Sequence, residues 1–299
     1  MTLTMLHRRD PRRPSTQTPI GICVQSPHAP AMLASASPLA FVSVADTSEL
    51  WVEPLSQLYP VHLQADWLTI GTAHGPASAQ LDKLQAQLAA IEVERVTVAL
   101  DASCICHPPD LAWQPVLTQL SDLRQRLQQP ILLDASPVWH AGWAPADQAE
   151  ILVHLCQRSG CQLQLDLHAL LVQGLNRARQ QGWTLASGHA DTLRALGMAR
   201  AEALDLIWGL PPSLVGEVRL GGFLWPAEPD EDITPERNQR LTPTAWSLYE
   251  EALEHLGAIP TLIDWNHQLP PLAVLLDEAR LAAQYLGEQH DCEQTELFN

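Results

Sequence analysis

The chain has 299 residues, of which 46% are hydrophobic and 17% charged, the composition of an ordinary globular protein. Its formal net charge of −17 at pH 7 argues against nucleic acid or an anionic membrane surface as a partner, because either would require clustered Lys and Arg. No apolar run reaches the ~20 residues of a membrane span, so we expect a soluble, cytoplasmic protein.

Residues 1–19 form a basic arm in which four arginines oppose one aspartate. The arm has three prolines and no apolar periodicity, so we expect it to be disordered. No apolar stretch follows Arg13, which argues against a signal peptide. The six cysteines of the chain are expected to be reduced thiols, and a weak zinc-like spacing occurs only at Cys104, Cys106 and His107.

Strand-like and helix-like segments then alternate through residues 20–286. The eight predicted strands cover residues 21–24, 50–53, 61–71, 96–101, 131–134, 161–166, 216–222 and 260–264. The predicted helices begin at Ser78, Pro115, Pro145 and Thr242, with two more within 168–209 and a closing helix at 272–286. This alternation predicts a (β/α)8 TIM barrel, with an open doubly wound sheet as the alternative, followed by an acidic C-terminal tail at 287–299.

Four of the apolar runs end on an aspartate. Asp101, Asp134 and Asp166 are spaced 33 and 32 residues apart, the length of one strand–helix unit, and Asp264 ends the last strand. In a parallel barrel these positions meet at the carboxyl end of the strands, where barrel enzymes carry their active sites. The residues expected at this mouth are Gln64, Asp101, Asp134, Asp166, His168, Arg219, Asp264 and Asn266.

Several carboxylates around one cavity cannot all stay ionised without a compensating charge, which a metal ion, protons or basic side chains can supply. Each aspartate taken singly is also typical of a cap on the following helix. His62 precedes Gln64 by two residues and is expected to face the same side of its strand. There is no Gly-x-Ser-x-Gly elbow, Walker-type loop or dinucleotide fingerprint, and Gly221-Gly222 is only a weak signal for phosphate.

Three C-terminal segments carry a family pattern. Residues 216–223, Gly-Glu-Val-Arg-Leu-Gly-Gly-Phe, are similar to a strand that reads Glu-Ile-His-Leu-Ala-Gly-His. Residues 246–249 and 257–266 are similar to a Val-Trp-x-Leu-Tyr helix and a Pro-Thr-Leu-Ile-Glu-Trp-Asp strand. Through these segments the chain, from about Glu53 to its last helix, resembles the multinuclear non-heme iron-dependent oxidases, typified by the enzyme that modifies peptide cysteines in methanobactin biosynthesis.

The resemblance implies a xylose-isomerase-like TIM barrel with a multinuclear iron centre held by His, Asp and Glu at the strand ends. This chain departs from that ligand set at most positions. Family histidines are replaced by Gln64, Asp101, Arg219 and Phe223, and family acids by the shorter Asp134 and Asp264 and the neutral Asn266. Asp166 is retained. The Asp-x-His that normally follows the seventh strand of the family is absent from residues 230–241, where Asp232 is the nearest acid.

Arg219 places a permanent positive charge where the resemblance puts a metal. Our hypothesis is that its guanidinium group forms charge-assisted hydrogen bonds with Asp134, Asp166 or Asp264 and takes over the electrostatic role of the irons. We therefore expect a family relative with a degenerate metal site that binds a peptide or a partner protein.

Two alternatives stay open: an active iron-dependent peptide-modifying oxidase, and a divalent-metal barrel of the sugar-isomerase type. The degenerate, peptide-binding barrel that we expect needs no cofactor. If the family activity is retained, the resemblance implies iron held by Asp134, Asp166 and Asp264, and a Cys-containing precursor peptide as the partner.

Overall fold

The computed structural model describes residues 19–72, 74–101, 113–136, 145–185, 190–225, 231–234 and 236–296. For residues 146, 190 and 288–296 it describes the backbone and not the side chain. The zinc-like group at Cys104, Cys106 and His107 lies outside these ranges, as does the basic arm up to residue 18.

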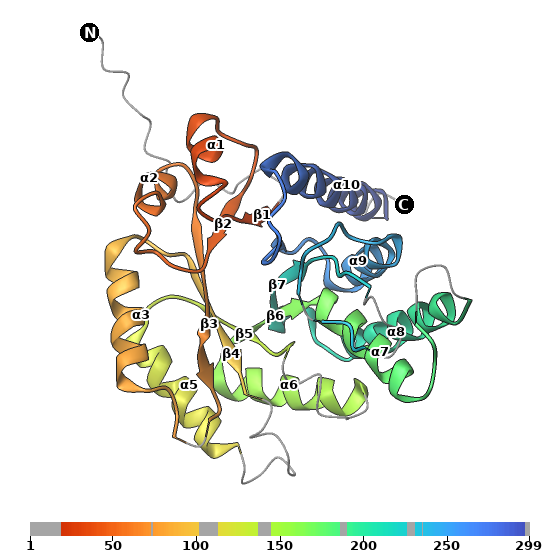
Figure 1. The fold of residues 1–299 in the computed structure, drawn as a ribbon. Helices are drawn as coiled ribbons and strands as arrows, with labels where there is room; N and C mark the ends of the chain where they lie inside the picture. The colour runs from red at the N-terminus through yellow and green to blue at the C-terminus, as the bar shows by residue number, and fades with distance from the viewer. Residues whose placement is uncertain are drawn as a thin grey trace.

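Eight parallel strands close into a barrel in which each strand pairs with the next and β8 returns to β1. The strands are β1 Ile20–Cys23, β2 Phe41–Val44, β3 Val61–Ile70, β4 Arg95–Leu100, β5 Ile131–Asp134, β6 Gln162–Asp166, β7 Val215–Leu220 and β8 Thr261–Ile263. In Figure 1 the strands surround the centre of the molecule and the helices lie outside them. The predicted (β/α)8 TIM barrel is confirmed.

The helices follow the strands in the expected alternation. They are α1 Ala29–Ala34, α2 Val52–Ser56, α3 Ser78–Ala90, α5 Gln114–Arg126, α6 Pro145–Ser159, α7 Leu167–Gln180, α8 Ala190–Trp208, α9 Pro243–Leu256 and α10 Leu272–Glu296, with a short 3-10 turn at Pro212–Leu214. Gly257 ends α9 with a φ of 70°, a conformation that glycine adopts without steric cost. α10 runs ten residues beyond its predicted end at Leu286. Within the described ranges, no helix is both long enough and apolar enough to cross a membrane.

The predicted second strand at residues 50–53 is wrong. The strand that pairs with β1 is Phe41–Val44, and most of the predicted segment belongs to α2 and the turn before it. Leu50, which made the segment look like a buried run, is 93% exposed. β2 is distinguished only by its pairing with β1. The two strands pack so closely that a Cβ added to Gly21 would lie 2.3 Å from the Phe41 ring.

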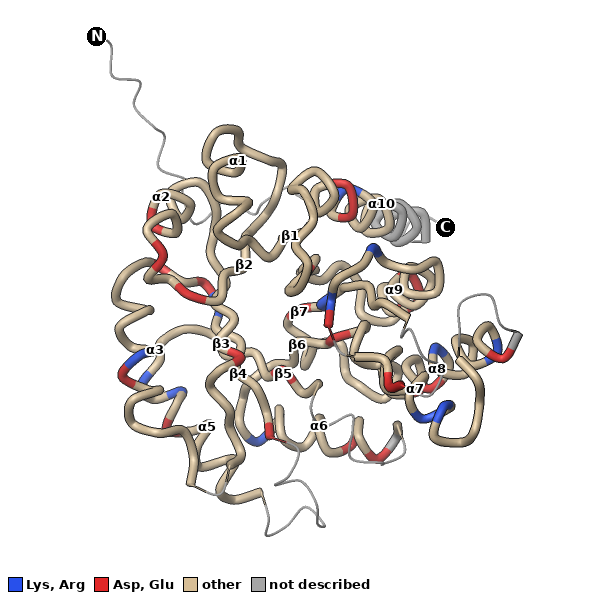
Figure 2. The backbone as a smooth tube through the Cα atoms, in the orientation of Figure 1, with Lys and Arg blue, Asp and Glu red and all other residues tan. Residues whose placement is uncertain are grey.

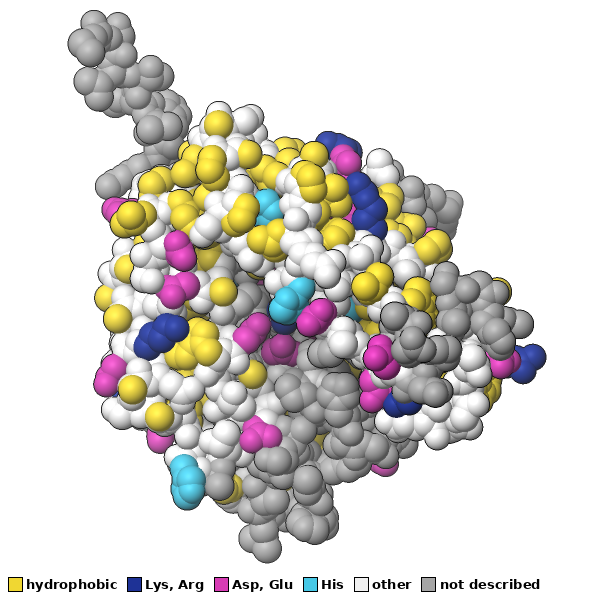
Figure 3. Space-filling model, in the orientation of Figure 1, with side chains coloured by type: hydrophobic (Ala, Val, Ile, Leu, Met, Phe, Trp, Pro, Cys, Tyr) yellow, Lys and Arg dark blue, Asp and Glu magenta, His cyan; other side chains and the backbone are white. Residues whose placement is uncertain are grey.

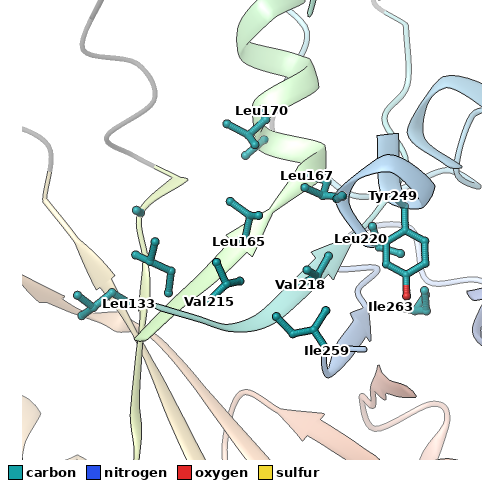
Figure 4. Close-up of a cluster of buried hydrophobic side chains, with 14 of the residues drawn as sticks. Leu133, Leu165, Leu167, Leu170, Val215, Val218, Leu220, Tyr249, Ile259 and Ile263 are labelled. Carbon is teal, nitrogen blue, oxygen red and sulfur yellow. The ribbon is translucent and has the colours of Figure 1, made fainter. Parts of the chain in front are cut away.

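The hydrophobic core lies between the outer face of the barrel and the helices. Figure 4 shows part of it, where strand side chains pack against α7 and α9. Leu165 and Val218 belong to this layer together with Leu167 and Tyr249 from the helices. Since strand side chains alternate between the two faces of the sheet, the residues next to Leu165 and Val218 point into the barrel. These neighbours are polar.

Candidate functional site

The carboxyl ends of β5 to β8 bring four charged side chains together inside the barrel. Asp134, Asp166, Arg219 and Asp264 are all buried there, and Asp166 pairs in register with Arg219. Figure 2 shows acidic and basic positions next to one another near β6 and β7, and Figure 3 shows acidic side chains gathered around the centre of this face. Because the strands are parallel and the chain alternates strand and helix, all four arrive at the same end of the barrel.

Arg219 forms the centre of the cluster. Its Nε and Nη2 lie 2.8 and 2.6 Å from Oδ2 of Asp264, and its Nη1 donates to Oδ2 of Asp134 at 3.1 Å. Nη1 also lies 3.3 Å from Oε1 of Gln164, and Nη2 lies 3.6 Å from the half-exposed Asp66. The contacts predicted for Arg219 are therefore present with Asp134 and Asp264.

A second guanidinium group, which sequence reasoning missed, comes from Arg237 in the connection between β7 and α9. Its Nη2 donates to Oδ2 of Asp166, and its Nη1 lies 3.4 Å from Oδ2 of Asp264. Asp166 also accepts from the backbone N of Ala169 at 2.9 Å, so it caps α7 as well as pairing with Arg237. The ion cluster, as we call it below, consists of Asp66, Asp134, Asp166, Arg219, Arg237 and Asp264.

Two local features hold Arg237 in place. A Cβ added to Gly221 would lie 2.6 Å from Cδ of Arg237, and one added to Gly222 would lie 2.2 Å from the Arg240 carbonyl oxygen. The glycine pair thus packs against the segment that carries Arg237. The sequence had suggested only a weak phosphate signal for this pair. Asn266, expected at the mouth, instead accepts from the Arg237 backbone N at 2.8 Å and donates back to its carbonyl oxygen at 3.0 Å.

The buried aspartates have different protonation behaviour. Burial by itself raises the pKa of Asp166, but the charges of Arg237 and Arg219 outweigh it and lower that pKa to about 2. The same two guanidinium groups lower the pKa of Asp264 against the effect of burial. For Asp134 burial prevails over the charge of Arg219, and the pKa is raised. The cluster therefore compensates Asp166 and Asp264 better than Asp134.

Below the ion cluster, polar side chains continue down the barrel interior. Gln164 donates to Oε1 of Glu217 at 2.7 Å, and Oε2 of Glu217 lies 2.7 Å from Nδ1 of His62. The His62 ring stacks on Phe41 with centroids 4.0 Å apart. Burial lowers the pKa of His62, but hydrogen bonds to Glu217 and Glu94 outweigh it and raise that pKa. His62 faces the interior as expected, near the amino-terminal end of β3, away from the mouth.

The remaining predicted site residues lie around this cluster. Gln64 is 5% exposed, and within the described part of the chain neither its amide oxygen nor its amide nitrogen has a hydrogen-bond partner. His168 is buried in the first turn of α7, its ring centroid 6.0 Å from that of Phe223, and its charge helps to lower the pKa of Asp166. Asp101 lies just beyond β4, where its backbone N donates to the Ile70 carbonyl oxygen at 2.7 Å.

The described residues do not fit a multinuclear iron centre. Asp134, Asp166 and Asp264 each have an oxygen paired with a guanidinium group. Across the ranges that the structure describes, no group of three or more His, Cys, Asp and Glu side chains is arranged to hold a metal ion. Iron in proteins prefers imidazole and carboxylate ligands, and a cation in their midst opposes it.

Comparison with known proteins places the chain in a family. Residues 19–287 match the family described as RiPP precursor modification enzyme MbnB/TglH/ChrH. A UPF0276 protein of Rhizorhabdus wittichii is 25% identical over 285 residues, which cover 88% of this chain and 92% of that protein. A UPF0276 protein of Chromobacterium violaceum is 28% identical over 141 residues, but these cover only 47% of this chain and 42% of the relative.

A solved structure supports the fold independently. A xylose isomerase domain-containing protein from Salmonella typhimurium LT2 matches with a TM-score of 0.51, covering 95% of this chain and 98% of that protein. The identity is 14%, so the likeness shows a xylose-isomerase-like barrel and carries nothing about activity.

Proposed function

Because the chain belongs to the RiPP precursor modification enzyme MbnB/TglH/ChrH family, we propose that it serves peptide modification as a barrel that binds a peptide or a partner protein, with the ion cluster in place of a metal centre. The observation that carries this proposal is the position of Arg219, whose guanidinium group bridges Asp264 and Asp134 at the centre of the mouth. Arg237 neutralises Asp166 in the same way.

Electrostatics supports this assignment. A divalent ion about 4 Å from a guanidinium group meets roughly 8 kcal/mol of repulsion at an effective dielectric constant of about 20. Arg219 and Arg237 would both oppose such an ion, and the carboxylates that could offset the repulsion are already paired with them. Oxygen activation requires a redox-active metal, so these residues favour binding over oxidation.

The partner that this function implies is a Cys-containing precursor peptide, or a protein that acts on one. We place the protein in the cytoplasm, where thiols stay reduced. The cysteines whose side chains the structure describes, Cys23, Cys156 and Cys161, are free. The sugar-isomerase reading has only the shared fold to support it.

Metal analysis tests the proposal against the active oxidase. The full chain is expressed with added iron, purified, and its iron content is measured by mass spectrometry before and after chelation. We expect far less than one iron per chain and an unchanged melting temperature after chelation. One or more equivalents of iron, or a melting temperature that falls on chelation, would overturn the degenerate site and favour the oxidase reading instead.

A binding experiment tests the peptide. Fluorescently labelled peptides from reading frames next to the gene, with their cysteines intact or replaced by serine, are titrated with the full chain. Saturable binding supports the proposal, and failure of all of them to bind counts against a precursor peptide as the partner.

A further inference from the structure

The ion cluster carries more negative than positive charge. Four carboxylates, those of Asp66, Asp134, Asp166 and Asp264, face the two guanidinium groups. A protonated His168 beside Asp166 would still leave one negative charge. Asp134, whose pKa burial raises, can remove part of this excess by taking up a proton. Asp66 is the most weakly paired of the four carboxylates, because its one ion pair among the described residues is with Arg219 at 3.6 Å, and Arg219 lies closer to Asp134 and Asp264. The excess negative charge is therefore centred on Asp66, where one further cation is favoured.

Gln64 supplies an independent indication of a ligand. On β3, His62 contacts Glu217 and Asp66 contacts Arg219, and these partners lie two residues apart on β7. Gln64 lies two residues beyond His62 in the part of β3 that pairs regularly with β4, which extends to Ala65, so it shares the inward face of His62. It therefore faces the barrel interior between the levels of Glu217 and Arg219. Its buried amide has no partner among the described residues.

An unpaired buried amide is rare in folded proteins, because the group loses its hydrogen bonds to water without replacing them. The amide oxygen of Gln64 is a hydrogen-bond acceptor without a donor among the described residues. The excess of negative charge nearby favours a positively charged donor. A primary ammonium group meets both demands, since it carries three donors on a slender aliphatic stem. A planar guanidinium group is wider. It fits this mouth less well, because the carboxylates other than Asp66 are only 0–7% exposed.

We propose that the mouth binds the primary ammonium group of a lysine side chain of the peptide, with Gln64 and Asp66 as its acceptors. This inference rests on the proposed peptide-binding function and names the group that is recognised. Leu224, which is half-exposed after β7, and Trp225, which packs on Phe223, lie on the mouth side of the barrel where they can contact the stem. The thiol of a peptide cysteine is neutral and does not compensate the excess negative charge of the ion cluster.

Two small probes isolate the ammonium group. N-acetyl-lysine methylamide and N-acetyl-norleucine methylamide differ only in that group, and their binding to the full chain is measured by saturation-transfer NMR and calorimetry. We expect the lysine probe to bind and the norleucine probe not to bind. Binding of the lysine probe should weaken as salt is added, because a half-exposed ion pair is screened.

Two variants locate the site, each with a matched control on the outer helix α5. Asp66→Asn and Gln64→Leu should each weaken binding of the lysine probe by about threefold or more. Asp122→Asn and Gln125→Leu, at exposed positions of α5, should leave it unchanged. Asp66 is half-exposed, so its variant stays folded even if the Gln64 variant does not, and circular dichroism checks both.

The outcomes separate this inference from the proposed function. Equal binding of the two probes, no binding of the lysine probe, or variants that behave like their controls would overturn the ammonium site in protein shown to be free of iron. Iron at one equivalent or more in the same sample would overturn the proposed function, and this inference with it.

Discussion

The two faces of the barrel sheet differ in what holds them together. On β7 the outward Val218 and Leu220 pack in the apolar layer under the helices, whereas Glu217 and Arg219 point inward and make hydrogen bonds and ion pairs. The interior of a TIM barrel is ordinarily filled by branched apolar side chains. Here much of it is polar. The stability of the outer face therefore depends on the volume and the buried area of its apolar side chains. The stability of the inner face depends on which polar or charged partner each side chain meets.

The largest effect is expected from Arg219→Leu. It leaves Asp134 and Asp264 buried without their shared cation, which should cost about 3–5 kcal/mol of unfolding free energy in urea titrations. The double variant Arg219→Leu with Asp264→Leu should recover much of that loss. Arg280→Leu, which removes an exposed guanidinium group paired with Asp277, should change stability by less than about 0.5 kcal/mol. Equal losses for Arg219→Leu and Arg280→Leu would refute the view that the inner face depends on pairing.

On the outer face, Leu165→Ala should cost about 3 kcal/mol, through lost burial and the cavity left behind. This loss should be the same at pH 5 and pH 8, because no titrating partner is involved. Leu165→Met, which conserves volume, should cost less than about 1.5 kcal/mol. A Met variant as unstable as the Ala variant would contradict an interpretation based on volume.

The inner face should also make stability depend on acid. The pKa of Asp166 is about 2 in the folded chain, below its ordinary value near 3.8, so the folded state holds this proton less tightly than the unfolded state. The contribution, about 2.5 kcal/mol, is present above pH about 4 and is lost as the pH falls from about 4 to about 2. Asp166→Asn should be less stable at neutral pH and should show a shallower acid loss in urea titrations. If the unfolding free energy of the variant falls with pH as steeply as that of the unchanged chain, the pKa of Asp166 is not lowered in the folded state.

The smallest effect is expected from Gly221→Ala. The added methyl group would displace the Arg237 side chain and weaken its contact with Asp166, at a cost of about 1–2 kcal/mol. Gly197→Ala on α8 is the control, since a Cβ there meets nothing within 4 Å, and it should be neutral or stabilising. Thermal melts compare the two variants, and equal melting temperatures would mean that Arg237 adjusts without loss.

Much of the barrel was predictable from local pattern. Seven of the eight strands were predicted near their observed positions, because a buried parallel strand is a short apolar run between turn and helix signals. β2 failed since its four residues carry no stronger signal than the exposed run at 50–53, and only pairing with β1 distinguishes them. The inward side of His62 followed from strand alternation. The meeting of Arg219 with Asp134 and Asp264 followed from the parallel order of the strands together with the family resemblance, which puts Arg219 at a metal position.

The sequence by itself determined the alternation of strand and helix, the end of the barrel at which the aspartates lie, and the presence of an arginine among them. Only the tertiary structure decided that Arg237 pairs with Asp166, 71 residues away, that Gly221 makes room for it, and that Asn266 holds its backbone. The physical reason is that an irregular connection carries no periodicity from which its direction can be inferred. Which charge a buried carboxylate meets is set by packing across the barrel.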